Sequence, residues 1–172
     1  MINLIKKPMK YFYKFILTML IFEYFSINRK DTKKILKINT ISSKNEVKKK
    51  QFLKNYFKDN HDKSKRFKNS KFVFLKNRNE IIVSGWITSK KNNYWNIEEI
   101  DRKLNTKERT ILYDFETSME YRNKGYYTLI LKLIQNKYLK KKLLIYTQSS
   151  NKPSIRAIKK SGFKFKGLLK KF

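Results

Sequence analysis

The sequence contains no cysteine, one histidine, two prolines and four glycines among its 172 residues. Without cysteine, the chain can form neither disulfides nor cysteine-based metal sites. The single histidine, His61, lies in a run of charged residues. A zinc site or a catalytic triad built on histidine is therefore not expected, and no metal cofactor is predicted.

Acidic residues are also few, with 13 Asp plus Glu against 43 Lys plus Arg, which gives a formal net charge of +30. A charge of this size favours anionic partners such as nucleic acid, anionic lipid or a phosphate-rich cofactor. Compositional drift is the alternative, because Lys, Asn, Ile, Phe and Tyr are all abundant. Drift would enrich Asp and Glu about as readily, so it explains the lysines better than the imbalance.

No apolar run approaches the ~20 residues that a membrane-spanning helix needs. Within residues 1–30, the apolar run Phe15–Phe22 follows four lysines, Lys6, Lys7, Lys10 and Lys14. No small-residue cleavage site follows the run, so a signal peptide is not indicated. Two interpretations stay open. The segment is either a basic amphipathic anchor on the inner face of an anionic membrane, or a helix or leading strand packed on the domain.

The remaining chain alternates strand and helix patterns and has the length of one domain, residues 34–172, after an N-terminal extension of residues 1–33. Ser42 and Ser43 precede the first helical pattern and are candidate caps for it. Residues 58–70, which are dense in Lys, Asn and Asp, are expected to form a solvated loop. The predicted strands are 34–41, 71–75, 81–88, 110–117, 143–147 and 163–172, and helices are expected after Ser43, Gly125 and Asn151. This order predicts a mixed α/β sheet with helices on both faces.

Residues 110–131 contain a strand pattern, then Arg122-Asn-Lys-Gly125, then an apolar helical pattern. The first turn of a helix leaves backbone N–H groups unpaired, and the helix dipole adds partial positive charge there. Gly125 allows the backbone to approach a bound group closely, while Arg122 and Lys124 add formal charge. The stretch is therefore a candidate anion site, although a tight turn alone would also explain a single glycine.

These residues resemble the GNAT superfamily of acyl-CoA N-acyltransferases. Arg122-Asn-Lys-Gly-Tyr-Tyr127 is similar to the family's pyrophosphate loop, and Asn151-Lys-Pro-Ser154 followed by Gly162-Phe163 is similar to its Asn-x-x-Ala/Ser segment. The four glycines, Gly85, Gly125, Gly162 and Gly167, fall where the family commonly has one. The resemblance implies a mixed, mostly antiparallel sheet, an α/β (α+β) fold, with a splayed central strand pair.

The resemblance also implies a use of acetyl-CoA as co-substrate. Residues 123–128 would bind its pyrophosphate through their N–H groups, and strands 111–117 and 143–147 would diverge to admit the pantetheine arm. The Phe115 N–H would stabilise the oxyanion that forms on the thioester carbonyl. The expected cofactor-binding residues are Phe115, Thr117, Arg122, Asn123, Lys124, Gly125, Tyr126, Tyr127, Thr128, Asn151 and Ser154.

Three features depart from the family pattern. Tyr127 stands where a small residue is usual, so its ring must turn into the core to leave room for phosphates. Ile158 replaces the tyrosine that often protonates the leaving thiolate, and this makes Tyr126 and Tyr146 the candidate acids. The closing strand of the family is short or missing, because the sequence ends at Phe172.

Candidates for a general base are few. Asp114 and Glu116 share one side of the central strand, and Glu98 and Glu99 lie in the connection before it. A buried carboxylate there would have a raised pKa and could act as a base, whereas a solvated or ion-paired carboxylate could not do so as well. Trp86, Tyr94 and Trp95 are candidates for an acceptor pocket, with core packing as the alternative.

We therefore predict an N-acetyltransferase that transfers an acetyl group from acetyl-CoA to an amine by direct attack, with Phe115, Glu116, Asp114 and Tyr126 as catalytic candidates. The acceptor would be a small molecule or an envelope precursor. The enzyme would be cytoplasmic and able to contact the inner membrane face through residues 1–30. The alternative is a non-catalytic protein of the same fold that binds nucleic acid or the ribosome, although no RNA-binding motif supports specific binding.

Overall fold

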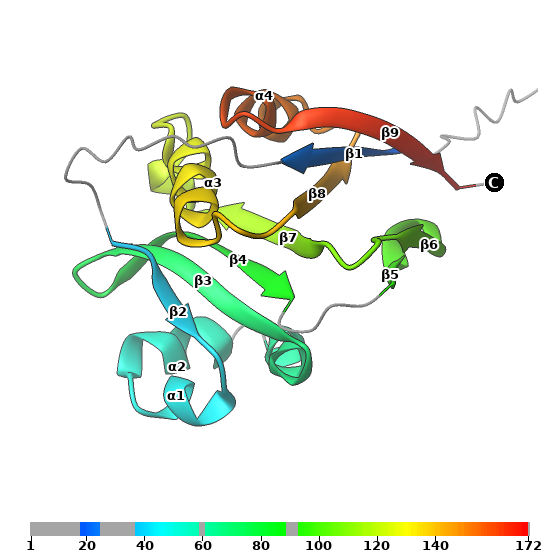
Figure 1. Ribbon diagram of the computed structural model, residues 1–172. Coiled ribbons are helices and arrows are strands. Elements are labelled where there is room, and N and C mark those ends of the chain that lie inside the picture. The colour runs from blue at the N-terminus through cyan, green and yellow to red at the C-terminus, as the bar shows by residue number, and fades with distance from the viewer. Residues whose placement is uncertain (1–17, 25–36, 59–60, 89–92, 172) are drawn as a thin grey trace, which may run out of the picture.

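The computed structural model describes residues 18–24, 37–58, 61–88 and 93–171. Its main sheet has the order β2-β3-β4-β7-β8-β1-β9, and β5 and β6 form a separate hairpin (Figure 1). Among the described strands, β7 and β8 are parallel, and the other neighbours are antiparallel. The strands are β1 Thr18–Tyr24, β2 Asn39–Ile41, β3 Ser70–Asn77, β4 Glu80–Thr88, β5 Tyr94–Ile97, β6 Arg102–Asn105, β7 Thr110–Thr117, β8 Leu143–Gln148 and β9 Lys164–Lys170.

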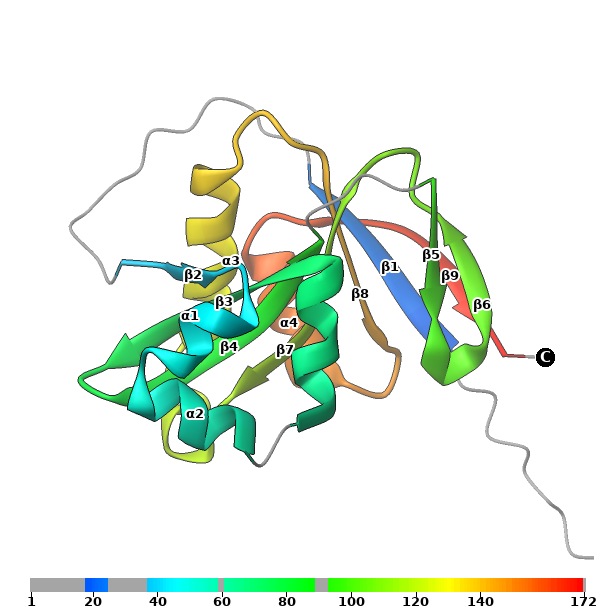
Figure 2. The ribbon, with the colours of Figure 1, turned by 90° about the horizontal axis from the view of Figure 1, so that it is seen from below.

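Helices cover both faces of this sheet, as the sequence predicted (Figures 1 and 2). The α-helices are α1 Lys44–Lys48, α2 Gln51–Lys58, α3 Tyr126–Lys137 and α4 Lys152–Lys160, and the short 3-10 helices are η1 His61–Lys68, η2 Glu98–Ile100 and η3 Met119–Tyr121. The predicted caps are present, since the Ser43 side chain accepts from the Glu46 N–H and Asn151 from that of Ser154. In the described ranges, no helix is long and apolar enough to cross a membrane.

Two apolar clusters lie on opposite faces of the sheet. One joins α1, α2 and the β5–β6 hairpin to residues such as Phe72 and Trp86, and the other joins α3 and α4 to residues such as Leu112 and Ile145. Adjacent residues of one strand therefore contribute to different clusters, as the alternation of a β-strand requires. This arrangement leaves the centre of the sheet covered on both sides.

The predicted loop at residues 58–70 is wrong, because most of it forms the 3-10 helix η1. Phe67 is the apolar anchor that fixes this helix, and its ring lies 4.9 Å from that of Trp86 between centroids. The connection before β7 is also more ordered than the sequence indicated, since β5 pairs with β6 from Tyr94 to Ile97. Both segments are rich in polar residues, so their periodicity was too weak to predict them.

The N-terminal strand β1 lies inside the main sheet, between β8 and β9. Phe22 is fully buried, and its neighbour Glu23 is only 4% exposed. The packed-strand interpretation therefore holds for Thr18–Tyr24, and the expected domain boundary after residue 33 is wrong for them. The other residues of the 1–33 segment lie outside the described part of the chain.

Candidate active site

The strands β7 and β8 pair only over their first residues and then separate. Their register joins Thr110 to Leu143, Ile111 to Leu144 and Leu112 to Ile145, and no later pair is formed between their described residues. The predicted splayed strand pair is thus confirmed. Since backbone groups beyond this point are not used in the β7–β8 ladder, the opening has hydrogen-bonding groups available on its walls.

A bulge in β7 shapes the opening next to this point. Asp114 has a φ of +49°, and the β4–β7 register shifts between Ser84 and Trp86. The bulge sets the ring of Phe115 over Gly85, where an added Cβ would lie 2.5 Å from the ring. Only glycine leaves room for this packing at position 85.

The predicted anion loop lies directly before α3. Gly125 is the N-cap of α3, has a φ of +80° and provides no side-chain cap, and a Cβ built there would meet nothing within 4 Å. The Nε of Arg122 donates to the carbonyl oxygen of Thr117 at 3.1 Å, and the Nζ of Lys124 lies 5.6 Å from the centroid of the Tyr121 ring. The start of α3 is therefore open, with positive charge beside it, and it fits an anionic group.

The first turn of α3 connects this loop to the interior. The Tyr127 ring stacks on Phe115, with centroids 5.6 Å apart, and its hydroxyl contacts the Ser154 side chain. Burial raises the pKa of Tyr127. The ring thus turns into the core, as an open phosphate site requires. Tyr126 lies beside Tyr121 at a centroid distance of 5.8 Å, and Thr128 is half-buried one residue after Tyr127.

The start of α4 lies beside the start of α3, because Ser154 contacts Tyr127. Asn151 is exposed and accepts from the Ser154 N–H at 3.1 Å. Ile158 is fully buried in the α3–α4 cluster, so this position of α4 supplies packing in place of a proton. The two motifs that carried the resemblance therefore meet in space.

The central-strand carboxylates are not buried. Glu116 is 55% exposed in its side chain and pairs with Lys63 at 2.9 Å, and Asp114 pairs with Arg66. Both partners belong to η1, which confirms that the two carboxylates share one side of β7. Of the two alternatives for these carboxylates, the ion-paired one holds, because η1 supplies cations that keep both groups paired near the surface.

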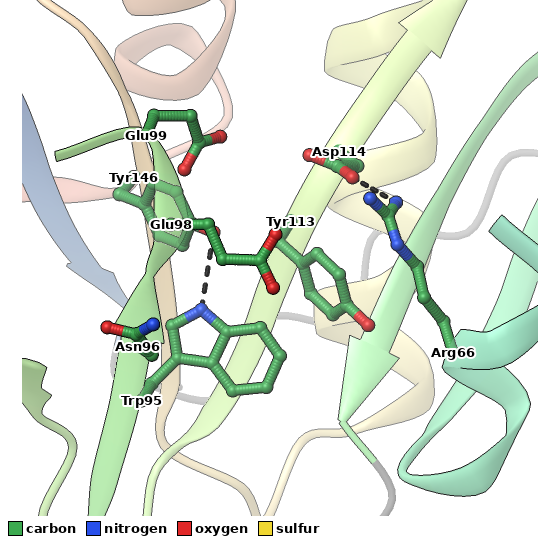
Figure 3. Close-up of a pocket in the computed structure, with 8 residues that line it drawn as sticks. All are labelled: Arg66, Trp95, Asn96, Glu98, Glu99, Tyr113, Asp114 and Tyr146. Atoms are coloured by element: carbon green, nitrogen blue, oxygen red, sulfur yellow. Dashed lines mark hydrogen bonds and ion pairs between the residues drawn. The ribbon is translucent and has the colours of Figure 1, made fainter. Parts of the chain in front are cut away.

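A pocket of about 110 Å³ lies where β7 and β8 have separated (Figure 3). The Trp95 indole N–H donates to the Tyr146 hydroxyl at 3.2 Å, and the Tyr113 hydroxyl donates to Ser70 at 2.8 Å. Burial raises the pKa of both tyrosines. Strands β7 and β8, η1 and the β5–η2 segment all contribute to the lining residues, which are Arg66, Trp95, Asn96, Glu98, Glu99, Tyr113, Asp114 and Tyr146.

Of the aromatic residues considered for an acceptor pocket, Trp95 lines it. Trp86 is 1% exposed and belongs to the core, and Tyr94 is 60% exposed without lining the pocket. Arg66 was not predicted from the sequence, because the polar composition of residues 58–70 indicates a loop. The signal available was Phe67, a single apolar residue in a charged run. No group of His, Asp and Glu in the described ranges could hold a metal ion.

Comparisons with known proteins agree with this geometry. Residues 37–163 match the family model described as "Acetyltransferase (GNAT) family". A comparison with curated proteins found no match.

Solved structures share the fold at low sequence identity. A GNAT-family acetyltransferase from Colwellia psychrerythraea has 11% identity and a TM-score of 0.54, with 90% of this chain and 54% of that one covered. A protein from Novosphingobium aromaticivorans DSM 12444 assigned to the same family has 13% identity and a TM-score of 0.58, with 90% and 62% covered. A functionally unknown protein from Staphylococcus epidermidis ATCC 12228 has 10% identity and a TM-score of 0.55, with 89% and 59% covered.

The chain spans only between about half and three fifths of the length of these solved proteins. The family match, however, covers most of the chain and includes both motifs of the site. The chain belongs to the GNAT acetyltransferase family.

Proposed function

We propose that the chain transfers an acetyl group from acetyl-CoA to an amine, without a covalent enzyme intermediate. The observation that carries this proposal is the junction of an open helix start with a splayed strand pair. Gly125 opens the start of α3, and β7 parts from β8 beyond Leu112. One long ligand with a phosphate end and a thioester end fits both features at once.

The pyrophosphate of coenzyme A would bind the backbone N–H groups of residues 123–128, with Lys124 adding charge. Space supports this assignment, because Tyr127 is turned towards Phe115 and away from the loop. Asn151 and Ser154 would flank the pantetheine arm from the start of α4, which lies beside α3. The Arg122 side chain is directed to the Thr117 carbonyl, so it would orient the loop as well as attract the anion.

Acetyl-CoA supplies the activated thioester, and backbone groups of β7 would hold it for attack. The pantetheine arm would pair with the free edge of β7 near Thr117. The Phe115 N–H would donate to the thioester carbonyl oxygen as negative charge develops there. The bulge at Asp114 supports this role, because it changes the direction of the backbone just before Phe115. Holding the two reactants in line accounts for the remaining catalysis.

Tyr146 is the best placed of the two tyrosines to protonate the leaving thiolate. It lies on β8 immediately after the last pair with β7, and its hydroxyl accepts from Trp95, which leaves its own proton free for donation. The phenol is protonated at neutral pH, and burial raises its pKa further, so it would give up its proton only to a strong base such as the developing thiolate. Tyr126 lies at the start of α3, nearer to the expected phosphates. Asp114 or Glu116 would accept the amine proton through water.

An acetyl-transfer assay that follows release of the coenzyme A thiol tests the proposal. Tyr146→Phe should lower kcat by roughly 10²-fold, the size of a typical general-acid contribution, and leave acetyl-CoA binding unchanged. Tyr94→Phe is the matched control, since Tyr94 is exposed outside the pocket. If a broad panel of amines causes no thiol release, and the protein is instead retained on RNA in moderate salt, the nucleic-acid alternative would replace this proposal.

A further inference from the structure

The pocket where β7 and β8 separate has a charge opposite to that of the whole chain. The chain has only 13 acidic residues and a net charge of +30. Three of those acidic residues, Glu98, Glu99 and Asp114, line this one pocket, where Arg66 is the single cation. Arg66 pairs with Asp114, whereas Glu98 and Glu99 form no ion pair with any residue in the described ranges. Two carboxylates therefore remain uncompensated.

The walls of the pocket are aromatic and held in place. The rings of Trp95 and Tyr113 lie 4.7 Å apart between centroids, and Trp95 also donates to Tyr146. Figure 3 shows the Glu98 side chain reaching towards Tyr113, while Arg66 approaches Asp114 from the η1 side. Aromatic faces pack against methylene groups and attract cations. A short alkyl chain with positively charged ends matches both properties of the lining.

The pocket also lies at the point of the proposed reaction. Tyr113 and Tyr146 are the first residues of β7 and β8 beyond their last pair. Both pack with the cluster on the α2 face, whereas α3 packs on the other face. A ligand in the pocket would thus approach the opening from the side opposite to the proposed coenzyme A site, so the two reactants could meet there without competing for the same space.

We infer that the acceptor is a small aliphatic diamine or polyamine, an inference that rests on the proposed acetyl transfer. One neutral amine nitrogen attacks the thioester carbonyl carbon. The new C–N bond forms as the C–S bond breaks, the nitrogen loses a proton to a carboxylate or water, and the coenzyme A thiolate gains one from Tyr146. A second amino group stays protonated and is held by Glu98 and Glu99. The products are an N-acetylated amine and coenzyme A.

The charge pattern selects against other acceptors of similar size. A monoamine has no second cation for Glu98 and Glu99. An amine on an acidic or phosphorylated carrier would place negative charge next to these two carboxylates, which costs binding energy. The inference therefore favours a small molecule over a phosphorylated envelope precursor.

Titration calorimetry on the full chain tests this inference with 1,4-diaminobutane and spermidine as probes and n-butylamine as the control with one charge. Both probes should bind at least about tenfold more tightly than n-butylamine, and added salt should weaken them. The double variant Glu98→Gln/Glu99→Gln should weaken diamine binding roughly tenfold, since it removes both carboxylates that would pair with the second amino group, and exposed ion pairs are individually weak. Glu120→Gln, an exposed glutamate outside the pocket, should change nothing.

Acetyl-CoA binding, measured in the same instrument, separates the two proposals. In steady-state assays with a diamine, the double glutamine variant should raise the KM for the diamine with little change in the KM for acetyl-CoA. If acetyl-CoA binds but the diamines bind no better than n-butylamine, the inference about the acceptor is wrong and the proposed acetyl transfer stands. If acetyl-CoA does not bind, the proposed function fails and this inference fails with it.

Discussion

The ring of Phe115 occupies the space that a side chain at Gly85 would need. A Cβ on Gly85 would lie 2.5 Å from the ring, much closer than normal contact. The same ring stacks on Tyr127 of α3, with centroids 5.6 Å apart. A glycine in β4 thus allows the bulge in β7 to be packed against the helix that begins the proposed phosphate site.

We predict that Gly85→Ala destabilises the protein by about 1–3 kcal/mol, the usual cost of overpacking a core. The added methyl group must displace the Phe115 ring and, through it, Tyr127. Urea unfolding at neutral pH gives the free energy of unfolding. Gly167→Ala is the control, because a Cβ there meets nothing within 4 Å. Equal stabilities of the two variants would contradict the packing described here.

Removal of residues 1–24 should prevent cooperative folding, whereas removal of residues 1–17 should not. The longer truncation deletes β1 and uncovers the edges of both β8 and β9. It also removes Phe22, whose burial contributes about 2–3 kcal/mol. Thermal unfolding followed by circular dichroism distinguishes the two. A cooperative transition in the longer truncation would show that β1 is dispensable.

The shorter truncation also tests the predicted membrane contact. It removes Lys6, Lys7, Lys10 and Lys14, which attract anionic lipid by roughly 1 kcal/mol each near a surface. Because Phe22 is buried in the sheet, this residue cannot supply the apolar part of the predicted membrane contact. We expect the full chain to sediment with anionic vesicles and the truncated chain to stay in solution. Equal sedimentation would contradict the prediction.

Arg109→Met should cost more stability than Glu23→Gln. The Glu23 carboxylate is 4% exposed and pairs with Arg109, while Lys166 lies 3.8 Å away on the surface. Removing Arg109 leaves the buried carboxylate with the longer, solvent-exposed pair to Lys166, and breaking a buried ion pair typically costs about 3–5 kcal/mol. Removing the charge of Glu23 leaves Arg109, which is 13% exposed and can reach water. Urea unfolding of both variants gives the order, and the reverse order would contradict this account.

Alkaline pH should destabilise the protein through its buried tyrosines. Burial raises the pKa of Tyr127 and Tyr146 above their ordinary value of 10.0. A group whose pKa is raised on folding contributes stability that is complete below the unfolded pKa and is lost as pH rises above it. The free energy of unfolding should therefore fall above pH 10.0. Tyr127→Phe should reduce this fall, whereas Tyr94→Phe, at an exposed position, should not. If the free energy of unfolding falls equally with pH in the unchanged chain, Tyr127→Phe and Tyr94→Phe, the buried Tyr127 is not a cause of the fall.

The sequence predicted the parts of the site whose local pattern has a clear physical cause. A strand, a short turn with Gly125 and an apolar helix predicted the open start of α3, and Asn151 with Pro153 predicted α4. The divergence of the central strands followed from the family resemblance. These features depend on residues close together in the sequence or on a known family pattern.

Other parts depend on contacts between distant segments. Nothing in the local pattern of residues 18–24 indicates that β1 inserts between β8 and β9, because its register is set by both neighbours. The ion pairs of Asp114 and Glu116 required η1, which the sequence analysis had assigned to a loop. The pocket was missed as a unit for the same reason, although Trp95, Glu98 and Glu99 had each been considered.

The central claim is that the start of α3 binds acetyl-CoA, and calorimetry with this ligand tests it most directly. The full chain should bind acetyl-CoA, and Gly125→Glu should weaken binding at least about tenfold by adding a negative charge at the phosphate site. Gly167→Glu is the control for a new glutamate away from the site, because a Cβ there also meets nothing within 4 Å, and it should bind like the unchanged chain. Gly125→Gln has the same strain at a φ of +80° without the negative charge, and it should bind more tightly than Gly125→Glu. Absence of binding by the unchanged chain at millimolar acetyl-CoA, or binding by Gly125→Glu equal to that of the unchanged chain, would contradict the account.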